Sequence, residues 1–166
     1  GADPAYAERT GGFPGVMAEL DTGIDGPVTA FRFDIDCLPY QEPKKEGFRP
    51  FDEGYISCND GNVHACGHDA HTAIGLGVAE TILEQRDKLK GKIRFLFQPA
   101  EERYNGALSM VAKGLLDDVD YFIGIHMALT AEGYPLPSNT ICCGCKDFLS
   151  DDQVDVTFHG KAAHPC

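Results

Sequence analysis

Residues 28–36 read VTAFRFDID, a run of β-branched and aromatic side chains that ends in two aspartates. This composition is typical of a buried β-strand. Two later runs have the same character, KIRFLFQ at 92–98 and VDYFIGIH at 119–126. We expect all three segments to be buried strands.

Between the first two strands the apolar residues change to helical spacing. They recur on one side of a helix and are Ile74, Val78, Ala79, Ile82 and Leu83. Asp69 is a plausible N-cap and Gly91 a stop signal, so the pattern predicts a helix over 70–86 that packs on the sheet. Gly75 and Gly77 each cost the helix roughly 1 kcal/mol relative to alanine, which suggests close approach to the sheet.

A second, shorter helix is predicted over 105–113, ending at Gly114. The residues expected to face inward are Ala107, Met110 and Val111. Strands that alternate with helices indicate the α/β class, with a mostly parallel sheet flanked by helices.

Polar motifs follow the ends of the predicted strands. Asp34 and Asp36 close the first strand, QPAEE (98–102) follows the second, His126 closes the third, and HACGHDAH (64–71) precedes the helix. The carboxyl ends of parallel strands lie at one edge of a sheet, where binding sites form. We therefore expect these four segments to meet in one cleft.

Composition and charge exclude several function classes. The chain has 166 residues, of which 43% are hydrophobic, and a formal charge of -12 without any basic run, so nucleic acid is disfavoured as a partner. The apolar runs are too short to cross a bilayer, and the opening residues lack a signal-peptide pattern. We expect a cytoplasmic protein with no membrane partner. Seven scattered cysteines favour free or metal-bound thiols over disulfides.

The motif HACGHDAH concentrates metal-ligating residue types. His64, Cys66 and His68 alternate, so an extended backbone puts them on one face, and Gly67 permits a turn. Thiolate and imidazole groups are preferred ligands of zinc, so the motif predicts a metal site. His64 is the weakest member and is equally compatible with a structural role.

Asp69 and His71 follow in the same motif. Either residue could orient a metal ligand, as hydrogen-bonded groups around metal sites do. The alternative is that both are residues of the first helical turn without a part in the chemistry.

Adjacent glutamates follow Pro99 at the end of the second strand. Neighbouring residues on near-extended backbone point in opposite directions, so one carboxylate of the pair Glu101 and Glu102 can ligate a metal while its neighbour acts as general base on water. The alternative is a solvated acidic pair. His126 could be a hydrogen-bonded core histidine, but its place at the end of a strand favours a ligand role. Asp36 could fix the tautomer of a ligand histidine or form an Asx-turn, and both readings stay open.

Two cysteine and histidine patterns near the end of the chain are weaker. A rival zinc site would use Cys142, Cys143, Cys145 and His159, but CC-x-C lacks the spacing of zinc knuckles and favours buried thiols instead. In HGKAAHP (159–165), Gly160 suggests a turn that projects His164.

Four motifs in order, HACGHDAHTA, FQPAEE, GIHM and DVTFHGKAAHP, resemble the dinuclear-metal aminoacylase and carboxypeptidase-like peptidase family, in its amidohydrolase branch. That branch includes N-acyl-amino-acid amidohydrolases, hippurate hydrolases and indole-acetyl-amino-acid hydrolases. FRFDIDCLP and the opening GADPAYAERTGGFPGVMAELDTG are most similar to its group of aminobenzoyl-glutamate utilisation proteins.

The resemblance implies a zinc-exopeptidase-like catalytic domain that hydrolyses the amide bond of a small N-acyl amino acid, such as aminobenzoyl-glutamate. It implies two divalent metal ions, zinc or manganese, with Cys66 bridging both; the implied ligands are Cys66, His68, Glu102 and His126. Glu101 matches the general base, His164 a histidine that steadies the oxyanion, and Asp36 a carboxylate beneath the site.

Family members also carry a further ligand histidine and a lid or dimerisation domain. We therefore expect residues 1–158 to be part of the catalytic domain and 159–166 to start the connection to that lid. The chain looks like an internal piece of a longer enzyme, a homodimer or hetero-oligomer in its full-length form, and inactive as an isolated piece.

Two other functions fit the same residues. Cys66 could be a nucleophile with His68 or His71 as its base and no metal. Alternatively, the metal could only stabilise a non-catalytic binding module. Chelators and a Glu101→Gln substitution distinguish these hypotheses from a metal-dependent hydrolase.

Overall fold

The computed structural model describes residues 15–127, 130–131, 134–142, 156–157 and 159. The chain divides into two compact units, Gly1–Met127 and Ala128–Cys166, and each is described by itself. Within the described part of the second unit, β5 (Thr130–Ala131) and β6 (Tyr134–Pro135) form a short antiparallel pair. Among the described residues, no helix has the length and apolar character needed to cross a membrane.

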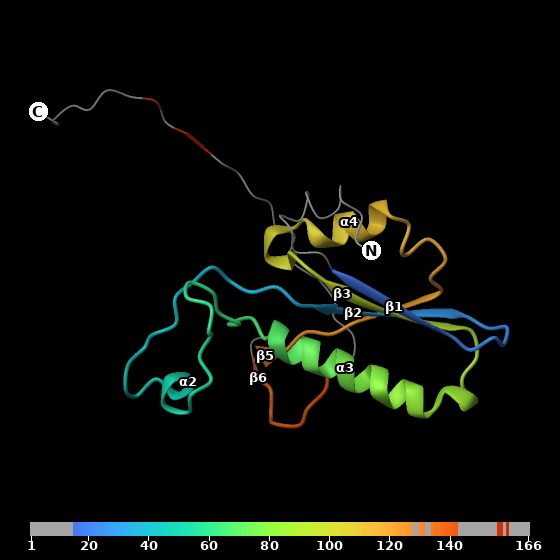
Figure 1. Ribbon diagram of the computed structural model, residues 1–166, viewed down its shortest axis with the longest axis horizontal. Coiled ribbons are helices and arrows are strands. Elements are labelled where there is room, and N and C mark those ends of the chain that lie inside the picture. Colours follow the sequence, from blue (N-terminus) through green and yellow to red (C-terminus); the bar gives the residue numbers. More distant parts are fainter. Residues whose placement is uncertain (1–14, 128–129, 132–133, 143–155, 158, 160–166) are drawn as a thin grey trace, which may run out of the picture. The chain divides into compact units, whose positions relative to one another are not determined.

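A four-stranded sheet forms the centre of the first unit (Figure 1). Its order is β1-β3-β2-β4, and the strands are β1 (Val16–Asp21), β2 (Val28–Asp34), β3 (Lys92–Gln98) and β4 (Tyr121–Gly124). β2 runs parallel to both β3 and β4, whereas β1 pairs with β3 antiparallel. The predicted α/β fold with a mostly parallel sheet is confirmed.

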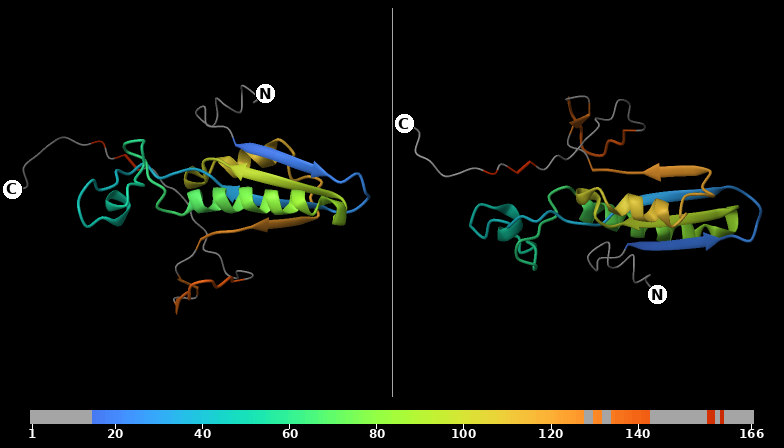
Figure 2. Two further views of the ribbon diagram at one scale, coloured as in Figure 1. Left: turned by 60° about the horizontal axis from the view of Figure 1, so that its bottom comes forward. Right: turned by 90° about the horizontal axis from the view of Figure 1, so that it is seen from above.

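Helices cover both faces of this sheet (Figures 1 and 2). The long helix α3 (His68–Glu84) lies along one face, and the short helix α4 (Gly106–Ala112) lies on the other. The remaining helical turns are short: α2 (Arg49–Asp52), η1 (Arg86–Lys88) and η2 (Glu101–Arg103). The unit therefore has three layers, with the sheet between α3 and α4.

Strand alternation divides the core into two apolar clusters. On the α3 side, Phe33, Ile93 and Phe95 are buried and contact Val78 and Ile82 of the helix. The rings of Phe31 and Phe95 stack across the two central strands with centroids 6.0 Å apart. On the α4 side the buried cluster is Ala30, Leu96 and Met110. β2 and β3 contribute to both clusters because their side chains point alternately to the two faces.

The inward face of α3 is narrower than the periodicity predicts. Val78, Ala79 and Ile82 pack against the core, but Ile74 is 39% exposed and Leu83 is 53% exposed. Those two predictions are wrong because both residues lie at the margin of the helix face that meets the sheet. The helix α3 nevertheless approaches the sheet closely at Gly75.

The two glycines of α3 differ. A Cβ atom on Gly75 would lie 2.7 Å from Phe97 and 2.9 Å from Phe33, whereas one on Gly77 would meet nothing within 4 Å. Close approach to the sheet therefore explains Gly75, as expected, but the expectation is wrong for Gly77. Gly77 lies on the exposed face of the helix.

The helix also begins earlier than predicted. Its N-cap is Gly67 and not Asp69, which lies in the first turn. Gly67 has φ 87°, a conformation that favours glycine, and the His71 N–H donates to the Gly67 carbonyl at 3.0 Å to close the first turn. This early start brings His68 into the helix.

The structure also differs from the sequence-based prediction at β4, α4 and β1. The apolar run of β4 predicts burial, but Tyr121, Phe122 and Ile123 are 44–62% exposed, and among the described strands β4 pairs with β2 alone. In α4, Met110 faces inward as predicted, whereas Ala107 and Val111 are exposed. The antiparallel edge strand β1 is absent from the sequence-based prediction.

Candidate metal centre

The carboxyl ends of β2, β3 and β4 meet at one edge of the sheet beside the start of α3, as the sequence predicts. The structure brings the four expected metal ligands together there. Single ligand atoms of Cys66, His68 and Glu102 all lie within 4.8 Å of one another. The Cys66 Sγ atom is also 3.6 Å from His126 Nε2. Cys66 thus lies close to His126 as well as to His68 and Glu102.

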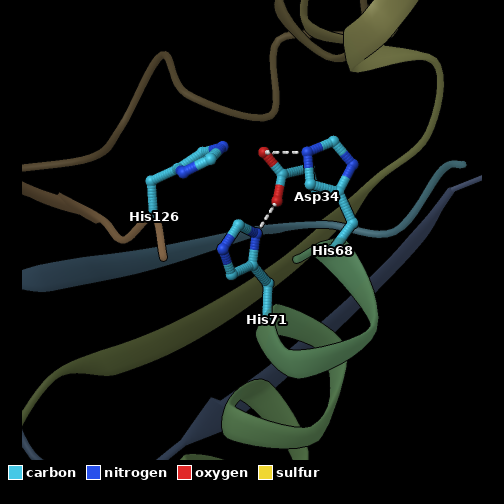
Figure 3. Close-up of side chains that lie close together, drawn as sticks. All are labelled: Asp34, His68, His71 and His126. Carbon is cyan, nitrogen blue, oxygen red and sulfur yellow. Dashed lines mark hydrogen bonds and ion pairs between the residues drawn. The ribbon is translucent and has the colours of Figure 1, made fainter. Parts of the chain in front are cut away.

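The first turn of α3 buries two histidines in this region. His68 is 1% exposed and His71 is fully buried. Their rings lie 5.3 Å apart between centroids, and both face Asp34 (Figure 3). Residues three apart on a helix share a face, so the start at His68 directs both rings toward the strand ends.

Asp36 determines which nitrogen of His68 carries the proton. His68 Nδ1 lies 3.0 Å from the Asp36 main-chain carbonyl and 3.1 Å from Asp36 Oδ1. Because a carbonyl only accepts hydrogen bonds, Nδ1 is the donor. His68 Nε2 is then left with a free lone pair in the neutral ring, which is the form that binds metals.

The same carboxylate also holds the loop that carries Glu102. The Glu102 main-chain N–H donates to Asp36 Oδ2 at 3.0 Å. Asp36 therefore positions two of the expected ligands at once, one through a ring and one through the main chain. Of the two readings open for Asp36, the structure favours the one in which it orients a ligand histidine.

Three buried atoms in the centre of the site lack hydrogen bonds within the described part of the chain: Asp34 Oδ2, His68 Nε2 and Glu102 Oε1. Asp34 Oδ2 forms an ion pair with Arg32 at 2.7 Å, whereas His68 Nε2 and Glu102 Oε1 lie 3.9 Å apart. Leaving such a group unsatisfied costs about 1–3 kcal/mol. A cation bound to both atoms would satisfy them, and 3.9 Å is less than twice a usual ligand distance of about 2.0–2.2 Å. The residues present therefore fit a metal ion.

The thiol of Cys66 is poorly ionised without a metal. Burial and the neighbouring Glu102 carboxylate raise the pKa of the Cys66 thiol to about 11. A bound cation favours the thiolate and reverses this effect. The raised pKa also argues against Cys66 as a metal-free nucleophile, because the thiolate is the reactive form.

Glu101 faces the same centre from the turn η2. Its Oε2 atom lies 3.9 Å from His68 Nε2, and its side chain is 36% exposed. Burial and the carboxylate of Glu102 raise the pKa of Glu101, although Arg32 and His68 oppose the shift. A partly accessible carboxylate with a raised pKa is suited to accept a proton from water.

The turn that presents both glutamates has an unusual backbone. Ala100 before it and Tyr104 after it adopt left-handed conformations with φ 51° and 55°. Such conformations are rare for residues other than glycine and each cost roughly 1 kcal/mol or more. Strained residues of this kind concentrate at functional sites, which agrees with the position of the glutamates.

Asp34 is fully buried between His71 and Arg32. Its Oδ1 atom accepts a hydrogen bond from His71 Nδ1, and its Oδ2 atom lies 3.7 Å from His68 Nε2 (Figure 3). The same Oδ2 atom lies 2.7 Å from Arg32 Nη1. Burial alone would raise the pKa of Asp34, but the His71 hydrogen bond and the Arg32 charge lower it overall. Asp34 is therefore a paired carboxylate and not a free one.

Sequence reasoning did not include Arg32, Asp34 and Gln98 among the site residues. Arg32 Nε donates to Gln98 Oε1 at 2.8 Å, so these residues link the strand ends of β2 and β3 to the site. A signal for Arg32 and Asp34 existed, because two charged residues at alternate positions of an otherwise apolar strand point to the same face, and a buried charge needs a partner.

The other predicted site residues lie elsewhere. Asp69 and His64 are exposed, and neither makes a hydrogen bond or ion pair with the site among the described residues. His164 lies outside the described residues, as do Cys143 and Cys145 of the rival zinc site. Cys37, Cys58, Cys66 and Cys142 are free thiols, as expected.

Comparison with known proteins agrees with this site. The family model of peptidase family M20/M25/M40 matches residues 30–164. The chain is 48% identical to indole-3-acetyl-aspartic acid hydrolase of Enterobacter agglomerans over 162 residues, 98% of this chain and 36% of that protein. It is also 48% identical to one of the subunits of p-aminobenzoyl-glutamate hydrolase of Escherichia coli over 154 residues, 93% of this chain and 34% of that protein.

A solved structure shows the same fold. A dinuclear metal binding peptidase of the M20 family from Bacillus subtilis matches with a TM-score of 0.61 and 44% identity over 69% of this chain and 30% of that chain. The chain thus spans about a third of the length of the curated relatives it matches. The resemblance inferred from the motifs is confirmed.

Proposed function

Because the chain belongs to peptidase family M20/M25/M40, we propose that it carries the metal centre of a metal-dependent amidohydrolase. The reaction is hydrolysis of the amide bond of an N-acyl amino acid. The observation that carries the proposal is the pair of buried atoms without hydrogen bonds, His68 Nε2 and Glu102 Oε1, at the centre of a thiol, imidazole and carboxylate cluster.

Four residues would hold two divalent cations, with Cys66 shared between them. The ligands are Cys66, His68, Glu102 and His126. The short separations of Cys66 from both His126 and the pair His68 and Glu102 support this sharing. Bound cations of this type act as Lewis acids and lower the pKa of water. Zinc and manganese both accept such ligands, and we propose one of the two.

Within this site Glu101 accepts a proton from the attacking water and returns it to the amine that leaves. Its partly accessible carboxylate beside the ligand cluster supports the first role. Asp36 keeps His68 and Glu102 in place during the reaction through its two carboxylate oxygens. We also propose that His164 stabilises the oxyanion, as the family resemblance implies.

The substrate proposal rests on the names of two relatives. Both names describe an acidic amino acid joined to an aromatic acyl group. We propose the same class for the longer protein that contains this chain, with aminobenzoyl-glutamate as the first compound to test. Aminobenzoyl-glutamine is the matched control, because it keeps the shape of aminobenzoyl-glutamate but removes the charge of the side chain.

The decisive experiment uses the longest protein that contains this sequence. We expect metal analysis to give about two ions per chain, and Glu101→Gln to abolish hydrolysis while the metal content stays unchanged. Loss of activity with thiol alkylation but not with chelators would instead support a Cys66 nucleophile. A protein with bound metal and no hydrolysis of any N-acyl amino acid would support a binding module.

We further propose that the longer protein is a homodimer or a hetero-oligomer. The name of one relative describes it as part of a multi-subunit hydrolase, which favours association with another chain. Sedimentation velocity tests this proposal, and a monomer at micromolar concentration contradicts it. The cytoplasmic location expected from composition stays a prediction.

A further inference from the structure

We propose that Asp34 and His71 position the ligand His126 through the main chain of Met127, and that His71 is not itself a metal ligand. This inference rests on the proposed function for the identity of His126 as a ligand. The hydrogen bonds that carry it are properties of the protein alone.

The proton of His71 is fixed by its two partners. The Met127 main-chain N–H lies 2.7 Å from His71 Nε2, and an amide nitrogen of this kind only donates. His71 Nε2 must therefore accept, so it carries no proton. His71 Nδ1 carries the proton and donates it to Asp34 Oδ1. The neutral ring is thus held in a single tautomer, with both nitrogens occupied.

Met127 passes this constraint on to His126. His126 Nδ1 lies 2.7 Å from the Met127 carbonyl oxygen, which only accepts, so Nδ1 carries the proton. The remaining nitrogen, Nε2, keeps its lone pair and lies 3.6 Å from Cys66 Sγ. The two polar groups of Met127 therefore contact two histidines, one on the N–H side and one on the carbonyl side.

The other end of this connection is anchored in the sheet. Asp34 Oδ2 pairs with Arg32 at 2.7 Å, and Arg32 Nε donates to Gln98 Oε1 at 2.8 Å. Arg32 is always charged and only donates, so the direction of each interaction is determined from this end as well. A continuous path joins the two central strands to His126.

The start of α3 passes close to Met127. A Cβ atom on Gly67 would lie 3.0 Å from the Met127 Cβ atom, which is a tight contact, and Gly67 has φ 87°, a conformation that favours glycine. Met127 itself is 51% exposed, whereas His71 and Asp34 are fully buried. The hydrogen bonds to the two histidines, rather than burial, therefore position the Met127 main chain.

A different arrangement of the same residues would be a separate metal site. Ligand atoms of Asp34, His68, His71 and His126 all lie within 4.8 Å of one another. His71 does not fit that role, because a metal ion would have to displace the Met127 N–H or the hydrogen bond to Asp34. Asp34 Oδ1 is likewise engaged by His71, and Asp34 Oδ2 lies between Arg32 Nη1 at 2.7 Å and His68 Nε2 at 3.7 Å.

The first test reads the tautomers directly in the longest protein that contains this chain, labelled with ¹⁵N-histidine and stripped of metal. We expect nuclear magnetic resonance to show a proton on Nδ1 of both His71 and His126, and no proton on Nε2 of His71. A proton on Nε2 of His71, or a doubly protonated ring, would overturn the inference. This outcome does not depend on metal binding.

The second test separates the two hydrogen bonds of His71. The amide of His71→Gln reaches the position of Nε2 and keeps an acceptor for Met127, whereas His71→Asn keeps only a donor for Asp34. We expect His71→Asn to weaken Co²⁺ binding about 10- to 100-fold, with recovery of most of the affinity in His71→Gln. Glu80→Gln, on the exposed face of α3, is the control and should bind Co²⁺ as the unmodified protein does.

The remaining outcomes are distinguishable. Equal loss of Co²⁺ affinity in both His71 variants, or no loss in either, overturns the inference. One Co²⁺ ion fewer per chain in both variants would identify His71 as a ligand and also overturns it. If the unmodified protein binds no Co²⁺, the proposed function fails, and the tautomers in the metal-free sample still decide whether the hydrogen-bond path exists.

Discussion

Two alanine substitutions on α3 should change stability in opposite directions. At Gly75, an added Cβ atom would lie 2.7 Å from the ring of Phe97 and 2.9 Å from the ring of Phe33. Phe33 is 1% exposed, so its ring has little space to move. At Gly77, the same atom would meet nothing within 4 Å. Both glycines lie in the interior of α3, which makes Gly77 a matched control for Gly75.

The magnitude follows from two opposing effects. Replacing glycine by alanine in a helix interior contributes about 1 kcal/mol of stability at either position. Overpacking a core by one carbon costs about 1–3 kcal/mol, and only Gly75→Ala incurs this cost. We therefore expect Gly77→Ala to stabilise by about 1 kcal/mol and Gly75→Ala to destabilise by up to about 2 kcal/mol. The difference between the variants isolates the steric cost because the helix propensity cancels.

Urea unfolding followed by circular dichroism measures both effects. We expect the unfolding midpoint to rise for Gly77→Ala and to fall for Gly75→Ala, with unchanged slopes. Equal upward shifts in both variants would show that α3 does not approach the sheet closely at Gly75. That result would refute the packing of α3 on Phe33 and Phe97 described above.

Three other perturbations test separate parts of the structure. Arg94→Met should lower the free energy of unfolding, measured in urea, by about 2 kcal/mol. The buried guanidinium of Arg94 donates two hydrogen bonds to Glu19, at 2.5 and 2.8 Å, and the variant leaves Glu19 without them. An unchanged free energy of unfolding would refute this reasoning. In the metal-free protein, iodoacetamide at about pH 8 should modify Cys58 before Cys66, because a pKa of about 11 leaves roughly 100-fold less thiolate at Cys66 than an ordinary cysteine has. The Cys66 rate should then rise with pH up to about pH 11, and equal rates at the two thiols would contradict this. Asp36→Asn should weaken metal binding about 10-fold in a calorimetric titration. The asparagine amide has one NH₂ group, which would face one of the two donors that Asp36 now accepts from, either His68 Nδ1 or the Glu102 N–H. Unchanged affinity would refute the role of Asp36.

Sequence patterns predict the centre of the fold better than its margins. β2, β3 and α3 are recognisable because buried segments must satisfy a strict periodicity of apolar side chains. β1 is missed because its residues are largely exposed. Even its apolar neighbours Val16 and Met17, which point to opposite faces of the sheet, are 55% and 44% exposed, so no alternation of buried and exposed residues marks the strand. The apolar run of β4 suggests burial, but composition alone does not show how many neighbours a strand has.

The candidate ligands can be predicted from side-chain chemistry, whereas their connections cannot. Cysteine, histidine and glutamate at strand ends are recognisable in a sequence. The path from Asp34 to His126 is not, because it runs through the N–H and carbonyl groups of Met127, which every residue except proline has. Gly67 offers an indirect signal, since a glycine within a ligand motif indicates close approach of another segment.

The two aspartates at the end of β2 show why alternation stops being informative there. On a continued strand, Asp34 and Asp36 would point the same way and compete for one partner. The strand ends at Asp34, so Asp34 engages His71 while Asp36 engages His68. The Nδ1 atom of each imidazole of α3 thus has its own carboxylate, while His68 Nε2 also lies 3.7 Å from Asp34 Oδ2.

This pairing also fixes the register of α3 against the sheet. A shift of the helix by one residue would rotate its side chains by about 100° and remove both imidazoles from their carboxylates. The buried carboxyl group of Asp34, the partly buried one of Asp36 and the two buried rings would then lose their partners, and a buried polar group without a partner costs about 1–3 kcal/mol. The contacts of α3 with Phe33 and Phe97 favour the same orientation, because they place Gly75 against the two rings. The hydrogen bonds at the helix start therefore select the one orientation in which His68 Nε2 faces Glu102, and the structure that stabilises the helix is the same structure that prepares the metal centre.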